Sequence, residues 1–267
     1  MKLLELFSGT HSIGKVAHEL NIDVVSLDKD LDDTCPLGTN YKSKKHFKIN
    51  IFDWDYKKEY PKGYFDIITA SPVCVWWSTL RATNIGKKMK LHNGKKLTRE
   101  MIEEDIEKYG VPMVDKVFEI IDYFQPKYWW IENPQTGRMK EYINDLIPFY
   151  DVDYCKYSDF GYKKRTRFWT NMEGFNPKLC KNDCDSIITI ETQKGDIHPS
   201  GSIIKSEYRK LHSNVISYKK QKAIKKFHVN TFSKINPIQK TIGGGNSRLD
   251  RYRIPKSLIE ELFNLCI

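Results

Sequence analysis

Short apolar runs alternate with stretches of helical periodicity along the chain as far as Asn171. The run at residues 3–7 is followed by a polar turn containing glycine, after which apolar residues recur at helical spacing from 13 to 20. The same periodicity predicts a second helix over residues 114–121. Further apolar runs predict strands at residues 24–28, 65–71, 128–133, 151–158 and 167–171.

Strands that alternate with helices are typical of an α/β domain built on a mostly parallel, doubly wound sheet. We expect this first domain to span residues 1–177. From 178 to 245 the pattern becomes polar, and residues 205–226 carry eight Lys or Arg against one acid, so we expect a small basic subdomain there. In residues 246–267, Pro255 suits a helix start, and the apolar stripe after it predicts a helix that returns to the first domain.

Composition narrows the class of protein. There are 44 Lys and Arg against 34 Asp and Glu, a net charge of +10. This excess favours a polyanionic partner. No apolar run is long enough to span a membrane and the N-terminus lacks a secretory pattern, so we expect a cytoplasmic or nucleoid-associated monomer. Six cysteines at irregular spacing favour reduced thiols over a disulfide framework.

Candidate cofactor-binding residues follow the first two predicted strands. Gly9 permits a close backbone approach, and the helix that follows offers free N–H groups. Asp28, at the end of the second strand, could accept hydrogen bonds from ribose hydroxyl groups. The acid favours a nucleoside cofactor, while the glycine turn alone is equally compatible with a purely structural role. His11 stands where a dinucleotide fingerprint would have glycine, which disfavours a dehydrogenase.

Candidate catalytic side chains lie at the ends of later strands. Cys74 follows residues 65–71 in a loop, where a thiol is either a nucleophile or an inert buried group. Glu132 and Asn133 end the strand at 128–133. A carboxyl group at a strand end is either solvated, or it is paired, protonated or part of a functional site. Arg165 and Arg167, two positions apart, share a face if their segment is extended, either as functional groups or as a solvated basic edge.

Six segments in one order resemble the DNA (cytosine-5)-methyltransferase family, particularly the short forms of phages and viruses. They are ELFSGTHSIGKVA, SLDKD, INIFDWDY, ASPVCVWWS, WWIENP and KKRTRFWT. The resemblance covers most of the chain up to Asn171. It implies a Rossmann-like S-adenosylmethionine-dependent methyltransferase domain with a small target-recognition subdomain.

The resemblance also implies roles for the candidate residues. Cys74 would add to carbon 6 of a cytosine flipped out of double-stranded DNA, and Glu132 would protonate or hydrogen-bond N3. Asn133 would hold that carboxyl group, while Arg165 and Arg167 would contact the base oxygen and the backbone. The residues implied for binding S-adenosyl-L-methionine are Phe7, Gly9, Thr10, His11, Asp28, Asn50, Ile51 and Pro72.

Several positions depart from the family pattern. Val73 precedes the cysteine where proline is usual, and His11 replaces a glycine. Asn50 replaces the usual aspartate, with Asp53 as a rival, and Trp76 or Trp77 could line the cofactor pocket. Other departures are Pro134 and Lys163. The final motif of the family is also hard to place, and residues 243–255 are the nearest candidate for it.

Two alternatives stay open beside DNA methylation. One is the same chemistry on RNA such as tRNA, and the other is a degenerate DNA-binding member without activity. Lysines in the polar stretch after Cys74 and in residues 205–226 would contact phosphates. An unusual donor derived from S-adenosylmethionine is also compatible with the sequence.

A metal site is the remaining question that the cysteines raise. Cys180 and Cys184 are close together in the sequence and are followed by His198, which is compatible with zinc. A fourth ligand is missing at the usual spacing, because Cys155 and His212 are remote in sequence. We therefore assign no metal from the sequence.

Overall fold

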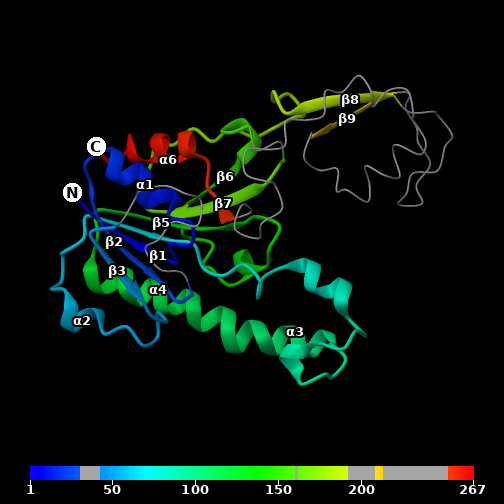
Figure 1. Cartoon of the computed structure of the whole chain (residues 1–267), viewed down its shortest axis with the longest axis horizontal. Helices are drawn as coiled ribbons and strands as arrows, with labels where there is room; N and C mark the ends of the chain where they lie inside the picture. Colours follow the sequence, from blue (N-terminus) through cyan, green and yellow to red (C-terminus); the bar gives the residue numbers. More distant parts are fainter. Residues whose placement is uncertain (31–42, 160–161, 192–207, 213–251) are drawn as a thin grey trace.

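The computed structural model describes residues 1–30, 43–159, 162–191, 208–212 and 252–267. Within these ranges, a sheet of seven strands lies between two helical layers (Figure 1). Its strand order is β3-β2-β1-β4-β5-β7-β6, in which the order reverses between β1 and β4. This is the order of a doubly wound, Rossmann-like sheet, whose ligands bind outside the carboxyl ends of the strands near that reversal.

The first five strands are parallel to one another. They are β1 (Lys2–Leu6), β2 (Asp23–Asp28), β3 (Lys45–Lys48), β4 (Ile67–Ala70) and β5 (Tyr128–Pro134). All four residues of β4 are buried, because helices cover both faces of the sheet there. An antiparallel pair, β6 (Phe149–Asp153) and β7 (Arg165–Thr170), completes the sheet, with β7 beside β5.

One helical layer consists of α1 (Ser12–Glu19) and α6 (Lys256–Phe263). They lie together above the sheet in Figure 1, and their apolar residues pack with β1 and β5 in one core cluster. The Trp130 and Phe263 rings meet edge to face at 5.5 Å. Lys256 pairs with Glu19 at 2.6 Å, so the end of the chain is fixed on the first helix of the domain.

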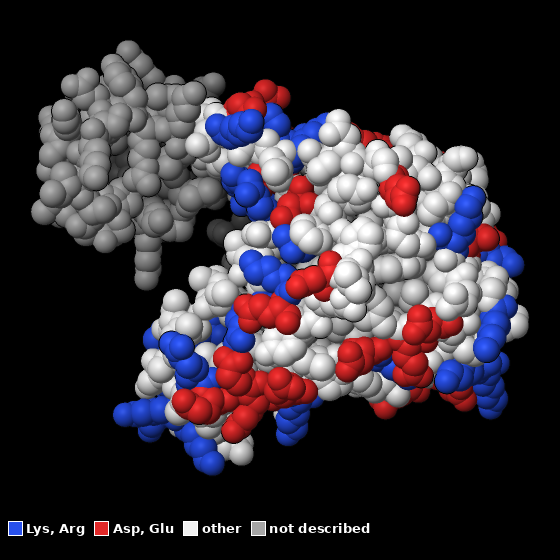
Figure 2. Space-filling model, turned by 180° about the vertical axis from the view of Figure 1, so that it is seen from behind, with Lys and Arg blue, Asp and Glu red and all other residues white. Residues whose placement is uncertain are grey.

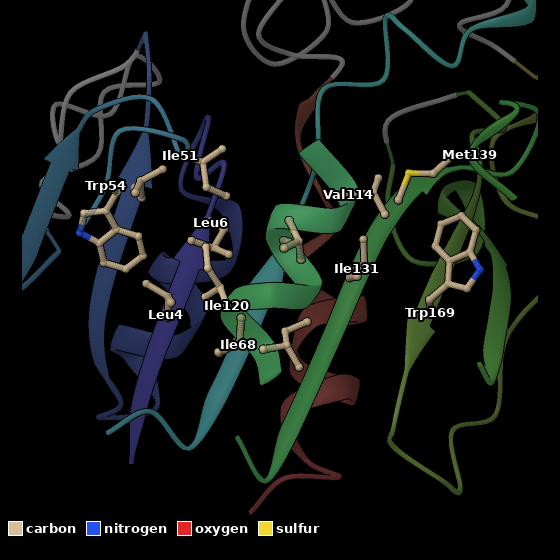
Figure 3. Close-up of a cluster of buried hydrophobic side chains, with 14 of the residues drawn as sticks. Leu4, Leu6, Ile51, Trp54, Ile68, Val114, Ile120, Ile131, Met139 and Trp169 are labelled. Carbon is tan, nitrogen blue, oxygen red and sulfur yellow. The ribbon is translucent and has the colours of Figure 1, made fainter. Parts of the chain in front are cut away.

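The opposite face of the sheet is covered by α4 (Val111–Phe124). Leu4, Leu6, Ile68 and Ile131 of the strands face Ile120 and its neighbours on this helix (Figure 3). Pro112 lies in the first turn of α4, directly after a π-type turn (Ile106–Gly110) in which the regular hydrogen-bond pattern of the helix is already interrupted. The second predicted helix is therefore present and is longer at both ends than its apolar stripe indicated.

A continuous helical segment carries the chain into α4. It begins with α3 (Arg99–Asp105) and passes through one wide π-type turn, Ile106–Gly110. A Cβ atom added at Gly110 would lie 2.9 Å from Cζ2 of Trp77, so a glycine lets the indole pack against the helix backbone. Trp77 is fully buried in the main core.

The sequence pattern missed several short elements, chiefly the edge strand β3, α2 (Tyr56–Glu59) and α3. β3 reads KHFK, and its mixed polar composition hides the strand period because it lies at the edge of the sheet. The strand predicted at 151–158 was wrong in its second half. It ends at Asp153, where residues Tyr154–Lys156 form a 3-10 turn.

The polar stretch after Cys74 contains two 3-10 turns, Thr79–Asn84 and Lys90–His92, where only a loop was expected. Of the region expected to form the basic subdomain, the structure describes β8 (Ile187–Glu191), β9 (Tyr208–His212) and the segment before β8. Outside the described residues lie residues 213–245, most of 205–226, His198, and the candidate final motif through residue 251. Among the described helices, none is long and apolar enough to cross a membrane.

Candidate active site and its comparison with known proteins

The predicted cofactor residues meet at the carboxyl edge of four neighbouring parallel strands. Phe7, Gly9, Thr10 and His11 follow β1, Asp28 ends β2, Asn50 and Ile51 follow β3, and Pro72 follows β4. This edge faces the side of the molecule from which α3 and β8 extend (Figure 1). The topology therefore brings together residues that are far apart in the sequence.

The turn after β1 contains three residues in the left-handed backbone region. Phe7, Gly9 and His11 have φ angles of 56°, 50° and 53°. This region favours glycine, whereas Phe7 and His11 adopt it with full side chains. His11 adopts this backbone region as a non-glycine residue, and its imidazole ring is fully buried.

His11 is held by Glu5, a buried carboxylate that was not among the predicted site residues. Nδ1 of His11 lies 3.3 Å from Oε2 of Glu5. The same side chain accepts hydrogen bonds from the backbone N–H of Gly14 at 3.0 Å and from the hydroxyl of Ser26 at 3.0 Å. Glu5 thus joins β1, β2 and α1 beneath the turn. In the sequence, the signal that could have pointed to Glu5 is a single acidic residue within an apolar run.

Asp28 shapes the same turn from β2. Its Oδ2 accepts the N–H of Gly9 at 3.0 Å, and its Oδ1 accepts the N–H of Asp30 at 2.9 Å. A carboxylate has about four acceptor positions, so ribose hydroxyl groups can still bind. The hydroxyl of Ser8, next to Gly9, is buried and has no hydrogen-bond partner among the described residues. An orphaned hydroxyl in this turn fits a polar ligand such as a nucleoside cofactor.

The turn after β3 supplies Asn50 and Ile51. The Oδ1 atom of Asn50 accepts the N–H of Phe52 at 3.3 Å, and its backbone carbonyl accepts the N–H of Asp53 at 2.9 Å. Asp53 itself is exposed, while Ile51 is buried. Asn50 is half-buried, and the choice between it and Asp53 stays a prediction.

Cys74 lies in the turn that follows β4, with a half-buried, reduced thiol. The adjacent Val73 and Val75 are 45% and 42% exposed, so the loop presents its surface to solvent on both sides of the thiol. The carbonyl of Pro72 accepts a hydrogen bond of 2.8 Å from Nδ2 of Asn133. This bond links the cysteine loop directly to the end of β5.

Glu132 is buried at the end of β5, and Tyr154 was missed as its main partner. The hydroxyl of Tyr154 donates to Oε1 of Glu132 at 3.0 Å, and Nζ of Lys164 lies 3.4 Å from the same oxygen. Burial, reinforced by the nearby carboxylate, raises the pKa of Tyr154 well above its usual value. The phenol therefore stays a donor, whereas Asn133 bonds to the loop and not to the carboxyl group.

Arg165 and Arg167 lie on β7, directly opposite two aspartates of β6. Arg165 forms two hydrogen bonds with Asp153, at 2.9 and 2.8 Å, and Arg167 forms two with Asp151, at 2.7 and 2.9 Å. The antiparallel register places DVD opposite RTR and so aligns these pairs. The sequence carried this signal, because opposite charges two positions apart on both strands match across a ladder.

The loop beyond Cys74 is anchored on the α3 segment. Trp76 stacks on Tyr109 at 4.7 Å, and Arg81 forms an ion pair with the buried Asp105. His92 also reaches Asp105, at 3.1 Å. Trp77 packs in the core and Trp76 packs on Tyr109. The described contacts of both rings therefore hold the loop in place.

Charges of both signs surround this loop. The lysines at 87, 88, 90, 95 and 96 are exposed. Acidic side chains gather at the neighbouring end of the molecule that carries α3 (Figure 2), where Glu100 and Glu104 are exposed. Among the described residues, the exposed lysines of this loop therefore lie beside an acidic surface on α3.

A second group of side chains meets beside β6. Cys155, Cys180, Cys184 and His212 are all buried, and their potential ligand atoms lie within 4.8 Å of one another. Cys155 and His212 were only remote candidates for further ligands in the sequence, because both lie far from the cysteine pair along the chain. The fold brings them to that pair.

These features together define a Rossmann-like domain in which the loop of Cys74 is hydrogen-bonded to the strand that carries the buried Glu132. No protein-family model matches the chain. The chain is 35% identical over 269 residues to the probable DNA (cytosine-5)-methyltransferase of Frog virus 3 (isolate Goorha), and the alignment covers 100% of both proteins. The chain therefore belongs to the DNA (cytosine-5)-methyltransferase family, as its six motifs indicated. S-adenosylmethionine is the methyl donor of this family.

Solved structures resemble the chain more distantly. A prophage-encoded protein of E. coli, assigned to the DNA modification methyltransferases, is 16% identical with a TM-score of 0.39, and the match covers 67% of this chain and 51% of that one. A mutant of DNMT2 from Spodoptera frugiperda is 17% identical with a TM-score of 0.39, covering 62% of this chain and 49% of the other. The chain spans about half of each solved protein.

Proposed function

We propose that the protein methylates carbon 5 of cytosine in DNA, with Cys74 as nucleophile and Glu132 as the acid at N3. The observation that carries this proposal is the 2.8 Å hydrogen bond from Asn133 to the carbonyl of Pro72. It ties the loop of the thiol to the strand end of the carboxyl group. The family relationship supports the choice of cytosine and of DNA.

Cytosine needs this pair because carbon 5 is a weak nucleophile. The thiolate of Cys74 adds to carbon 6, and the charge that develops in the ring is relieved when N3 gains a proton. Carbon 5 then carries enamine character and would attack the methyl group of the donor, whose sulfur would keep the electron pair of the broken bond and leave as S-adenosylhomocysteine. A base afterwards removes the proton from carbon 5, which restores the double bond and releases the thiolate of Cys74.

The contacts of the two carboxylate oxygens of Glu132 support its proposed role. Tyr154 and Lys164 both approach Oε1. Oε2 is therefore the oxygen that would face N3. The two donors fix the carboxyl group at the strand end, and they reduce the cost of holding it in a buried site.

S-adenosylmethionine, when bound, supplies the electrophilic methyl group. The residues that would hold it are those of the carboxyl edge, with Asp28 accepting from the ribose and Asn50 and Ile51 lying beside the adenine. The orphaned hydroxyl of Ser8 adds a donor to the residues that the motifs imply for this site. Since the reacting atoms of cytosine are unreachable inside a duplex, the base would be flipped out at a cost of about a few kcal/mol.

The test is transfer of labelled methyl from S-adenosylmethionine to unmethylated duplex DNA and, in parallel, to tRNA. Nucleoside mass spectrometry should find 5-methylcytosine in DNA with the wild type and none with Cys74→Ser. Product in tRNA alone would replace DNA by RNA as the substrate. Activity that persists in Cys74→Ser would remove this residue as nucleophile.

A trapping experiment separates an active site from a fold that only binds DNA. In 5-fluorocytosine, carbon 5 carries fluorine where the removable proton would be, so the adduct with Cys74 cannot break down. The wild type with S-adenosylmethionine should form a complex with such DNA that survives denaturing electrophoresis. Cys74→Ser is the matched control, and DNA binding without any trapped wild-type complex would identify an inactive member.

A further inference from the structure

The cluster beside β6 is made of four potential metal ligands from three separate stretches of chain. Cys155 lies in the turn after β6, Cys180 and Cys184 precede β8, and His212 ends β9. Their exposed fractions are 5%, 4%, 9% and 6%. None of the three cysteines is in a disulfide.

The spacing of the atoms matches a tetrahedral zinc centre. Zinc–sulfur bonds of about 2.3 Å and zinc–nitrogen bonds of about 2.0–2.1 Å place sulfur and nitrogen about 3.5 Å apart in a tetrahedron. Sγ of Cys180 lies 3.5 Å from Nε2 of His212. All four ligand atoms lie within 4.8 Å of one another, so small side-chain movements close the set.

The surroundings also suit a metal thiolate group. Three thiolates, a neutral imidazole and Zn²⁺ carry a net charge of −1, which needs positive charge nearby when it is buried. Lys163 donates from Nζ to the carbonyl of Cys180 at 2.8 Å, and Lys156 pairs with Asp183 in the turn between the two cysteines at 3.2 Å. The backbone N–H of Cys180 is held at 2.7 Å by Asp153, itself fixed by Arg165.

We propose that Cys155, Cys180, Cys184 and His212 bind one structural Zn²⁺ ion. Four protein ligands close the coordination sphere, as in structural sites, and leave no position for a substrate. Cys180 and Cys184 supply the paired ligands at the usual short spacing. This assignment replaces the absence of metal expected from the sequence, and it is independent of the function proposed for Cys74.

The ion would join the segment after β7 to the catalytic domain. Among the described residues, β8 and β9 pair only with each other, so the sheet of the first domain gives them no backbone support. Zinc would fix His212 and the cysteine pair to Cys155. Since Cys155 follows Tyr154, the donor to Glu132, the ion would also stabilise the chain beside the proposed acid.

The test measures metal in the full-length protein without DNA or donor. Protein purified without chelators should contain about one zinc per chain by elemental mass spectrometry, and the zinc should leave with a strong chelator and return when ZnCl₂ is added. Replacement by Co²⁺ should give the intense visible bands of tetrahedral coordination together with thiolate charge-transfer bands. These spectra need no variant and thus do not depend on whether a variant folds.

Variants identify the ligands. Cys155→Ser and Cys184→Ser should lower zinc occupancy at least tenfold under matched purification. Cys266→Ser is the control, since Cys266 is also a buried reduced cysteine but contacts Met172 and Leu262 outside the cluster. Folded wild type that fails to bind either Zn²⁺ or Co²⁺ stoichiometrically would overturn the proposal, as would full zinc occupancy in both cluster variants.

Discussion

The carboxyl edge of the sheet and the cysteine cluster organise functional side chains in different ways. At the edge, each group directly follows or ends a parallel strand, and backbone pairing sets its position. In the cluster, the ligands come from turns and from one end of β9, and the side chains themselves make the contacts.

The two sites also differ in what stabilises them. The edge rests on two large hydrophobic cores made of buried side chains of the domain. The cluster has a much smaller apolar group, with Ile187 as the added hydrophobic neighbour of the three cysteines. A small group of this kind gains most from a bound ion, because binding to the folded state adds directly to its stability.

The largest effect on the rate of methyl transfer is expected at Glu132, in the site at the edge of the sheet. Glu132→Gln keeps the size of the side chain but removes the acid, so we expect the single-turnover methyl-transfer rate to fall by about 10²–10⁴-fold. Zinc content and thermal stability should remain close to wild type. A single-turnover rate equal to wild type would disprove the role of this carboxyl group.

The next effect concerns the link between the strand and the thiol loop. Asn133→Ala removes the hydrogen bond to the carbonyl of Pro72, so the loop of Cys74 loses its anchor on β5. We expect about a 10–100-fold drop in kcat, since a displacement of about 1 Å can cost a factor near 10². Binding of S-adenosylmethionine, measured by calorimetry, should change little. An unchanged kcat would show that Trp77 and the α3 contacts hold the loop without Asn133.

Much of the edge could be predicted from the sequence because its signals are local. An apolar run followed by a small or acidic residue fixes both the strand and the position of that residue, as for Gly9, Asp28 and Glu132. The parallel sheet then brings these strand ends together without further information. The motif order also carried the family, which the viral relative confirms.

The remaining contacts depend on tertiary pairing that no local pattern contains. Tyr154 reaches Glu132 only because β6 returns beside β7, and the sequence had placed Tyr154 within a continuing strand. Cys155 and His212 lie far from the cysteine pair along the chain, so spacing alone could not assign them. Their proximity follows from where β6 ends and where β9 ends.

A smaller effect tests whether the two regions communicate. Tyr154→Phe removes the donor to Oε1 of Glu132 and leaves a buried carboxyl group with one fewer partner, a loss of about 1–1.5 kcal/mol. We expect about a tenfold lower rate of methyl transfer. Zinc occupancy should be unchanged, because the phenol is not a ligand. If zinc were lost as well, the turn carrying Cys155 would depend on this hydrogen bond and the two regions would form one unit.

The smallest effect concerns the charged surface of the thiol loop. Lys87→Gln, Lys88→Gln, Lys95→Gln and Lys96→Gln together remove exposed positive charge beside the acidic α3. Each phosphate contact contributes about 0.9 to the slope of log affinity against log salt concentration, so loss of two or three contacts should flatten the slope by about 2–3. Fluorescence anisotropy with duplex DNA at several salt concentrations measures it. An unchanged slope would place the DNA away from this loop.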